Sequence, residues 1–242
     1  MSKRFLPAAG NGGSAFFFPA LCGLVLGCLA LSACGGAGRG SGPATAPGAA
    51  AAPYSGQARD LAGGLSIEVP NGWNTVHVLD PGAVSKADLQ TRLKTSQAVP
   101  LLVLDHPTGQ GENIDGRFIL LITDSAKNFP PEKEVAASTA EELDQRAKAF
   151  MRQRNAAAVQ QKKQPDTLES RMTKETVDGR MALFHRGIGN GADGQVHYQI
   201  WHIYLPDGLG LAVDAVGSAS NPGVEKLLES MVRSIRIADA PR

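Results

Sequence analysis

Two unlike segments precede residue 58, and neither has the pattern of a folded domain. Residues 15–33 form a nearly uninterrupted apolar run, and Lys3 and Arg4 are the only charges before it. Residues 35–57 are almost wholly Gly, Ala, Pro, Ser and Thr, a composition that buries too little apolar surface to fold. We therefore expect the fold to lie in residues 58–242, a length suited to one domain with one core.

The apolar run ends in Leu31-Ser32-Ala33-Cys34-Gly35, which resembles the lipobox of bacterial lipoproteins. The resemblance implies a signal peptide over residues 1–33, cleavage before Cys34, and lipid on its thiol. Residues 34–57 would then be a lipidated cysteine and a disordered tether, held stably if two or more acyl chains are attached. An uncleaved membrane helix is the alternative, since the run is barely long enough to span a bilayer. Gly35 favours the outer over the inner membrane.

Cysteine and charge narrow the chemistry of the domain. Cys22 and Cys28 lie in the predicted signal peptide and Cys34 takes the lipid, so no thiol remains in residues 58–242. Disulfides, thiolate nucleophiles and cysteine-bound metals are excluded there. Cleavage removes two of the 24 basic residues and none of the 23 acidic ones, so the mature chain is nearly neutral. That balance argues against nucleic acid as a partner.

The pattern from residue 58 onward is that of an α+β domain. Alternating residues predict a strand over Leu65–Val69, which we expect to pair with a second strand through Val76 and Val78. Apolar runs predict interior strands at 101–104 and 118–123. Turn residues separate four further strands, expected to form successive antiparallel hairpins: 168–177, 180–188, 195–205 and 209–216.

Three helices are predicted from capping signals and apolar spacing. Ser85 and Asp88 form a capping-box pattern that begins a short helix at Lys86. Ser138 and Glu141 are expected to cap the longest helix, Thr139–Gln161. That helix should bury one stripe: Ala140, Leu143, Ala147, Phe150, Met151, Ala157 and Ala158. The last helix carries its apolar face on Val224, Leu227, Leu228, Met231, Val232 and Ile235.

Two segments resemble the family that includes the photosystem subunit PsbP and the bacterial lipoprotein DcrB. They are the opening Leu65-Ser66-Ile67-Glu68-Val69-Pro70-Asn71-Gly72-Trp73 and the closing Glu229-Ser230-Met231-Val232-Arg233-Ser234-Ile235-Arg236. The resemblance implies an α/β/α sandwich with a central antiparallel sheet and helices on both faces. It also implies binding, assembly or chaperoning, with no shared catalytic residues.

Motifs that often signal a ligand are better explained by structure in this chain. Gly189-Asn190-Gly191-Ala192-Asp193-Gly194 spells a phosphate-binding string, but a strand follows it instead of a helix, so a hairpin loop is favoured. His197 and His202 are five residues apart on one predicted strand, which places them on opposite faces and argues against a shared metal. We expect no cofactor and no metal.

His202 and Asp214 are the strongest candidates for acid–base chemistry. A three-residue turn at Pro206-Asp207-Gly208 would place both on one sheet face as diagonal neighbours, whereas a two-residue turn would separate them. No GxSxG elbow supplies a nucleophile. A satisfied polar pair is therefore favoured over a general acid or base, and we predict no catalytic residues.

The long predicted helix begins with acidic residues and continues with basic ones only. Complementarity to the helix dipole and a solvated face is the favoured explanation. The functional alternative is an interaction surface for an acidic partner or anionic headgroups, built from Arg146, Arg152, Lys162 and Lys163.

The leading hypothesis is a non-enzymatic, membrane-anchored envelope lipoprotein that acts as a protein-binding or assembly module. An immunity or adaptor protein for a secreted toxin is an alternative of the same class. A hydrolase that uses His202 and Asp214 is the alternative from a different class.

Overall fold

The computed structural model describes residues 56–107, 114–161, 167–191 and 194–238. Cys34, the predicted signal peptide, the predicted tether up to residue 55 and the Lys162-Lys163 pair lie outside the described residues. The first described strand begins at Gly56, so Gly56 and Gln57, which the sequence pattern assigned to the tether, belong to the folded domain.

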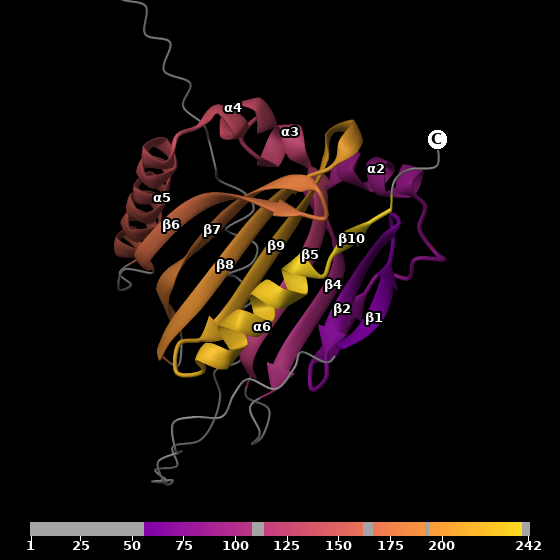
Figure 1. Ribbon diagram of the computed structural model, residues 1–242, viewed down its shortest axis with the longest axis horizontal. Helices are drawn as coiled ribbons and strands as arrows, with labels where there is room; N and C mark the ends of the chain where they lie inside the picture. The colour runs from indigo at the N-terminus through magenta and orange to yellow at the C-terminus, as the bar shows by residue number, and fades with distance from the viewer. Residues whose placement is uncertain (1–55, 108–113, 162–166, 192–193, 239–242) are drawn as a thin grey trace, which may run out of the picture.

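A seven-stranded sheet in which every neighbouring pair is antiparallel forms the centre of the fold (Figure 1). This confirms the expected antiparallel sheet, and the four strands after residue 166 form the successive hairpins that the turn residues predict. In spatial order the strands are β3 (Asn74–Val78), β4 (Ala98–Pro107), β5 (Ile114–Asp124), β9 (Leu209–Ser218), β8 (Gly194–Tyr204), β7 (Arg180–Gly191) and β6 (Thr167–Val177).

A second, three-stranded sheet corrects one predicted strand pairing. β2 (Leu65–Pro70) lies between β1 (Gly56–Leu61) and β10 (Arg236–Ile237), so both of its edges are paired. The strand through Val76 and Val78 is β3, which pairs with β4 and not with β2. The turn after Pro70 carries Trp73 into the core and lets the chain leave the first sheet for the second.

Helices cover both faces of the large sheet, as the resemblance implies (Figure 1). One face packs on α6 (Pro222–Arg233) and on the small sheet, and it holds the larger core, in which Phe184 stacks on Trp201 with ring centroids 3.9 Å apart. The other face holds a smaller core beneath α3 (Ser125–Asn128), α4 (Glu132–Ala137) and α5 (Ala140–Gln160). That smaller core comprises Leu121, Phe129, Val135, Leu143, Leu183, Tyr204 and Ala212.

Capping explains where the helices begin, with one correction. The Ser85–Asp88 capping box is present and begins α2 (Lys86–Thr95), as predicted. The box of α5 is formed by Thr139 and Glu142, one residue later than the predicted Ser138 and Glu141. The hydroxyl of Ser138 instead donates to the carbonyl of Glu134, 2.8 Å away, at the end of α4. Ser138 therefore caps the C-terminal end of α4 and does not cap α5.

Candidate functional site

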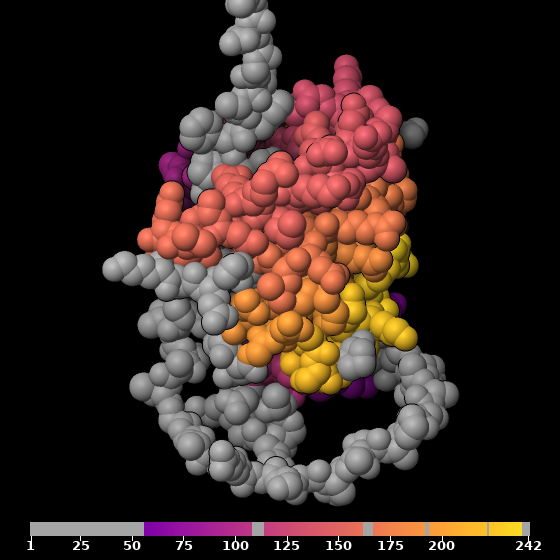
Figure 2. Space-filling model, turned by 90° about the vertical axis from the view of Figure 1, so that its left-hand side faces the viewer, coloured from indigo at the N-terminus to yellow at the C-terminus, as the bar shows by residue number. Residues whose placement is uncertain are grey.

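Helix α5 is the long element that the fold buries least. Of its 21 residues, only Leu143, Ala147 and Ala158 are buried. Phe150 and Met151 are half-buried and Ala157 is exposed, so the buried stripe is narrower than the sequence predicts. Figure 2 shows α5, in salmon tones, spread across the outer surface of the molecule. The helix therefore presents most of its length to solvent.

Polar contacts hold α5 against the edge strand β6. The amide of Asn155 donates to the carbonyl of Thr167 at 2.8 Å and its oxygen accepts from the Thr167 N–H at 2.9 Å. The hydroxyl of Ser170 lies 3.2 Å from the carbonyl of Ala147, to which it donates. These hydrogen bonds fix the position of α5 on β6, although few apolar side chains of α5 are buried.

Beneath α5 and α3, two histidines from neighbouring strands lie on one sheet face. The ring of His185 meets the edge of Phe150 at a centroid distance of 4.3 Å. The ring of His202 stacks on Phe129 at 4.4 Å. Burial lowers the pKa of His185 to about 3 and the pKa of His202 to about 4. Both imidazoles are therefore neutral at physiological pH.

The strand register places Asp214 on the same face. Asp214 lies opposite Ile200, and His202 lies opposite Ala212, which makes His202 and Asp214 diagonal neighbours. The turn between them does span three residues, Pro206–Gly208, closed by a 3.0 Å bond from the Leu205 N–H to the Leu209 carbonyl. Burial raises the pKa of Asp214 to about 7, partly offset by the positive charge of Arg154.

These pKa shifts run opposite to those that a catalytic histidine–aspartate pair needs. Such a pair needs an ionised carboxylate to stabilise the imidazolium that forms during proton transfer. Here burial favours the protonated carboxyl of Asp214 and the neutral imidazole of His202. The protonation states that burial favours suit a structural role for His202 and Asp214 inside the fold.

The structure supplies one hydroxyl that sequence reasoning missed. The Oγ of Ser170 lies 2.6 Å from Nε2 of His185, and the hydroxyl of Tyr198 lies 3.5 Å from the same nitrogen. Glycine at 187 leaves room for the Tyr198 ring to reach the carbonyl of Glu169, 3.0 Å away. Only 4% of His185 is exposed. This hydroxyl–imidazole pair therefore lies inside the fold, and no sequence motif around Ser170 predicts the contact.

The four basic side chains of α5 differ in their interaction partners. Arg146 lies 3.7 Å from a carboxylate oxygen of Glu134, and Lys148 lies 2.6 Å from one of Asp144. Arg154 lies over the ring of Phe150. Arg152 is exposed and forms no ion pair with another described residue. The predicted interaction surface therefore narrows to Arg152 within the described part of α5.

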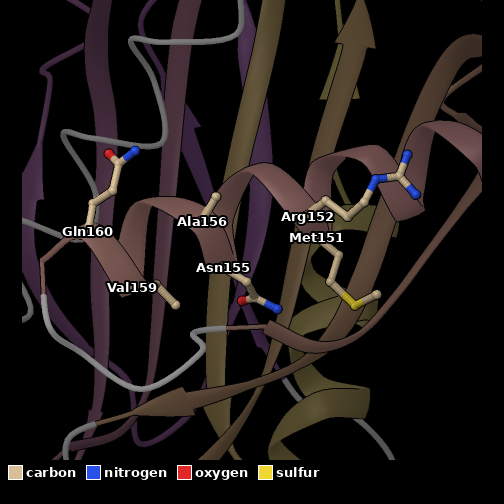
Figure 3. Close-up of a pocket in the computed structure, with 6 residues that line it drawn as sticks. All are labelled: Met151, Arg152, Asn155, Ala156, Val159 and Gln160. Carbon is tan, nitrogen blue, oxygen red and sulfur yellow. The ribbon is translucent and has the colours of Figure 1, made fainter.

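A shallow groove runs along α5 beside Arg152 (Figure 3). Ala156 and Gln160 point to one side of the helix in this view, whereas Met151, Asn155 and Val159 point to the other. Val159 is 63% exposed, and Leu168 on the adjacent strand is 42% exposed. We call this surface the α5 groove; its lining residues are Met151, Arg152, Asn155, Ala156, Val159 and Gln160.

A second polar cluster lies at the start of β5 and was not singled out from the sequence. Nδ1 of His106 contacts Oδ1 of Asp115, and the Asn221 amide donates to Oδ2 of Asp115 at 3.0 Å. The ring of Trp73 packs against His106 at a centroid distance of 5.1 Å. The cluster links β4, β5 and the start of α6. A hairpin separates His106 from Asp115 in the sequence, so only the strand register reveals their contact.

The described part of the chain contains neither a candidate metal cluster nor a helix that could span a membrane. No group of three His, Cys, Asp or Glu side chains there could hold a metal ion. His197 faces α6, with Nδ1 3.8 Å from a carboxylate oxygen of Glu225, while His202 lies on the opposite face, as the sequence predicts. No helix among the described residues is long and apolar enough to cross a membrane.

The chain is similar to several solved structures. No protein-family model and no curated protein matches the chain. It is similar to LpqN, involved in cell envelope biogenesis of Mycobacterium tuberculosis, at 11% identity and a TM-score of 0.42, covering 78% of this chain and 87% of LpqN.

A Bacteroides thetaiotaomicron protein is similar at 9% identity and a TM-score of 0.40, over 76% of this chain. The alignment spans about half of that protein, 49% of its length. The cyanobacterial PsbP of Synechocystis sp. PCC 6803 is similar at 18% identity and a TM-score of 0.43, covering 86% of this chain and 99% of that protein. The structures similar to this chain thus include a member of the PsbP group that its sequence resembles.

Proposed function

We propose that this chain is a non-enzymatic binding or assembly module of the bacterial envelope, anchored by lipid on Cys34, and that the α5 groove is its partner-binding surface. One observation carries the proposal: a 21-residue helix buries three residues and leaves an apolar, positively charged surface in solvent. Val159 and Leu168 are exposed on α5 and on the adjacent strand, with Arg152 at the rim of the groove, and apolar surface rimmed by polar residues is typical of an interaction site. A partner that covers the groove removes this apolar surface from water.

The polar groups beneath α5 support a structural role for His202 and Asp214. Burial lowers the pKa of His202 to about 4 and raises that of Asp214 to about 7, which favours the neutral form of each, and Phe129 covers the ring of His202. A hydrolase would need these groups to take up and release protons beside a bound substrate. We propose instead that the outside of α5 binds the partner.

The predicted lipid anchor fits the same function. Lipid on Cys34 would hold the protein at an envelope membrane, with the outer membrane favoured by Gly35. The Gly- and Pro-rich segment would separate the domain from the bilayer, which leaves the α5 groove accessible to a protein partner.

Site-specific photo-crosslinking in the native host tests the proposal. A photoreactive residue in place of Val159 should give a discrete protein adduct. The same residue in place of Val76 is the matched control, since this valine is 60% exposed on β3, at the other edge of the sheet. The control should give none of that adduct. Equal adducts at both positions, or no adduct at Val159, would contradict the proposal.

A further inference from the structure

We infer that the α5 groove receives an acidic amphipathic helix of a partner protein. This inference rests on the proposed function, in which the groove binds protein, and it names the chemistry of the segment that binds there.

The spacing of the groove residues favours a helical occupant. Met151, Asn155 and Val159 follow one another at intervals of four residues, so they form a stripe along one side of α5 (Figure 3). Rows of this kind are the ridges and grooves into which a second helix packs, with axes 8–10 Å apart.

The charge of α5 favours an acidic occupant. From residue 145 to its end at Gln160, α5 contains four basic residues and no acidic one. The helix dipole explains basic residues only in the last turn of a helix. Arg152 lies eight residues before the end of α5 at Gln160, which is beyond that range. Its guanidinium is exposed and has no carboxylate partner among the described residues.

The shape of the surface favours a protein over a membrane. A helix that lies in a bilayer interface needs a broad apolar face along its length. The apolar part of α5 is a narrow groove near its C-terminal end, around Val159, and Arg152 lies beside it. An amphipathic helix fits both features, with apolar side chains in the groove and carboxylates at its rim.

Mapping the Val159 adduct tests the inference directly. The intact lipoprotein with the photoreactive residue at 159 is crosslinked in native envelopes, and mass spectrometry identifies the attached segment. We expect a predicted helix with one apolar face and an excess of Asp and Glu. An adduct on a neutral, basic or extended segment would overturn the inference while leaving the proposed function intact. An adduct on lipid, or none, would overturn both.

Charge reversal supplies the second readout. Arg152→Glu should weaken binding of the mapped segment, as a synthetic peptide, by about tenfold or more. Lys226→Glu, at an exposed position on α6, is the matched control and should change binding little. Changing one carboxylate of the peptide to lysine should restore binding to the Arg152→Glu protein. Equal losses in the two variants, or no rescue by any such peptide, would overturn the acidic-helix inference.

Binding to vesicles distinguishes the remaining source of negative charge. The wild-type domain should bind mixed phosphatidylglycerol and phosphatidylcholine vesicles no better than the Arg152→Glu variant. Vesicle binding that is lost in Arg152→Glu and kept in Lys226→Glu would assign the groove to the membrane and overturn the inference.

Discussion

Burial lowers the pKa values of the histidines beneath α5 and α3 and raises the pKa of the neighbouring aspartate. His185 and His202 have pKa values lowered from 6.5 to about 3 and about 4. Their contribution to stability is therefore lost as the pH falls below 6.5, because both histidines bind protons in the unfolded chain at pH values where they stay neutral in the folded chain. Asp214 has a pKa raised from 3.8 to about 7. The folded chain keeps that proton, so Asp214 lowers stability as the pH rises from 3.8 to 7.

Asp214→Asn should therefore stabilise the protein in a pH-dependent way. Near pH 4 the variant and the wild type should unfold at nearly the same urea concentration. By pH 8 the variant should be more stable by about 2–4 kcal/mol, because one pKa unit corresponds to about 1.4 kcal/mol and the site is only partly exposed. Urea unfolding followed by circular dichroism measures the difference. A stability difference that does not change between pH 4 and pH 8 would contradict this account of Asp214.

The sequence leaves two strand registers open for His202 and Asp214, and the three-residue turn in the structure selects the register that places both on one sheet face. The contact between Ser170 and His185 could not be predicted from the sequence. It depends on the register between β6 and β7 and on the hydroxyl reaching Nε2 across the pair of strands. The burial that lowers the pKa values of His202 and His185 likewise includes the rings of Phe129 and Phe150, which come from distant segments.

At the scale of elements, local signals located the longer helices and strands but not the short elements α3, α4, β1 and β10. Tertiary contacts decided which strands pair. The capping box of α2 was predicted at the correct residues, since it needs only four consecutive residues. The box of α5 was shifted by one residue because the end of α4 uses Ser138. The partner of β3 was wrong because β1, whose alternation is weak, and β10, with two residues, occupy both edges of β2.

The limited burial of α5 makes Asn155 its main polar attachment. Asn155→Ala removes both hydrogen bonds to Thr167, which should cost about 1–3 kcal/mol. We also expect faster amide hydrogen exchange in the C-terminal half of α5, measured by mass spectrometry. Gln153→Ala, at an exposed position on the same helix, is the control and should leave exchange unchanged. Equal exchange rates in the two variants would show that other contacts hold the helix.

At the scale of the whole molecule, the proposed arrangement depends on one thiol. Cys34→Ser should abolish labelling by radioactive fatty acid in the native host and leave the precursor uncleaved, because the signal peptidase of lipoproteins requires the modified cysteine. Cys22→Ser and Cys28→Ser lie within the predicted signal peptide and serve as controls that should keep the label. Labelling that persists in Cys34→Ser would contradict the lipobox prediction.

The central claim is that the exposed face of α5 binds a protein partner. Affinity purification of the intact lipoprotein from native envelopes tests it most directly when wild type, Val159→Asp and Val76→Asp are compared. Both valines are similarly exposed, at 63% and 60%, so the two variants carry the same change at opposite edges of the sheet. We predict a stoichiometric partner with wild type and Val76→Asp, and its loss with Val159→Asp. Retention of the partner by Val159→Asp, or its equal loss from both variants, would contradict the claim.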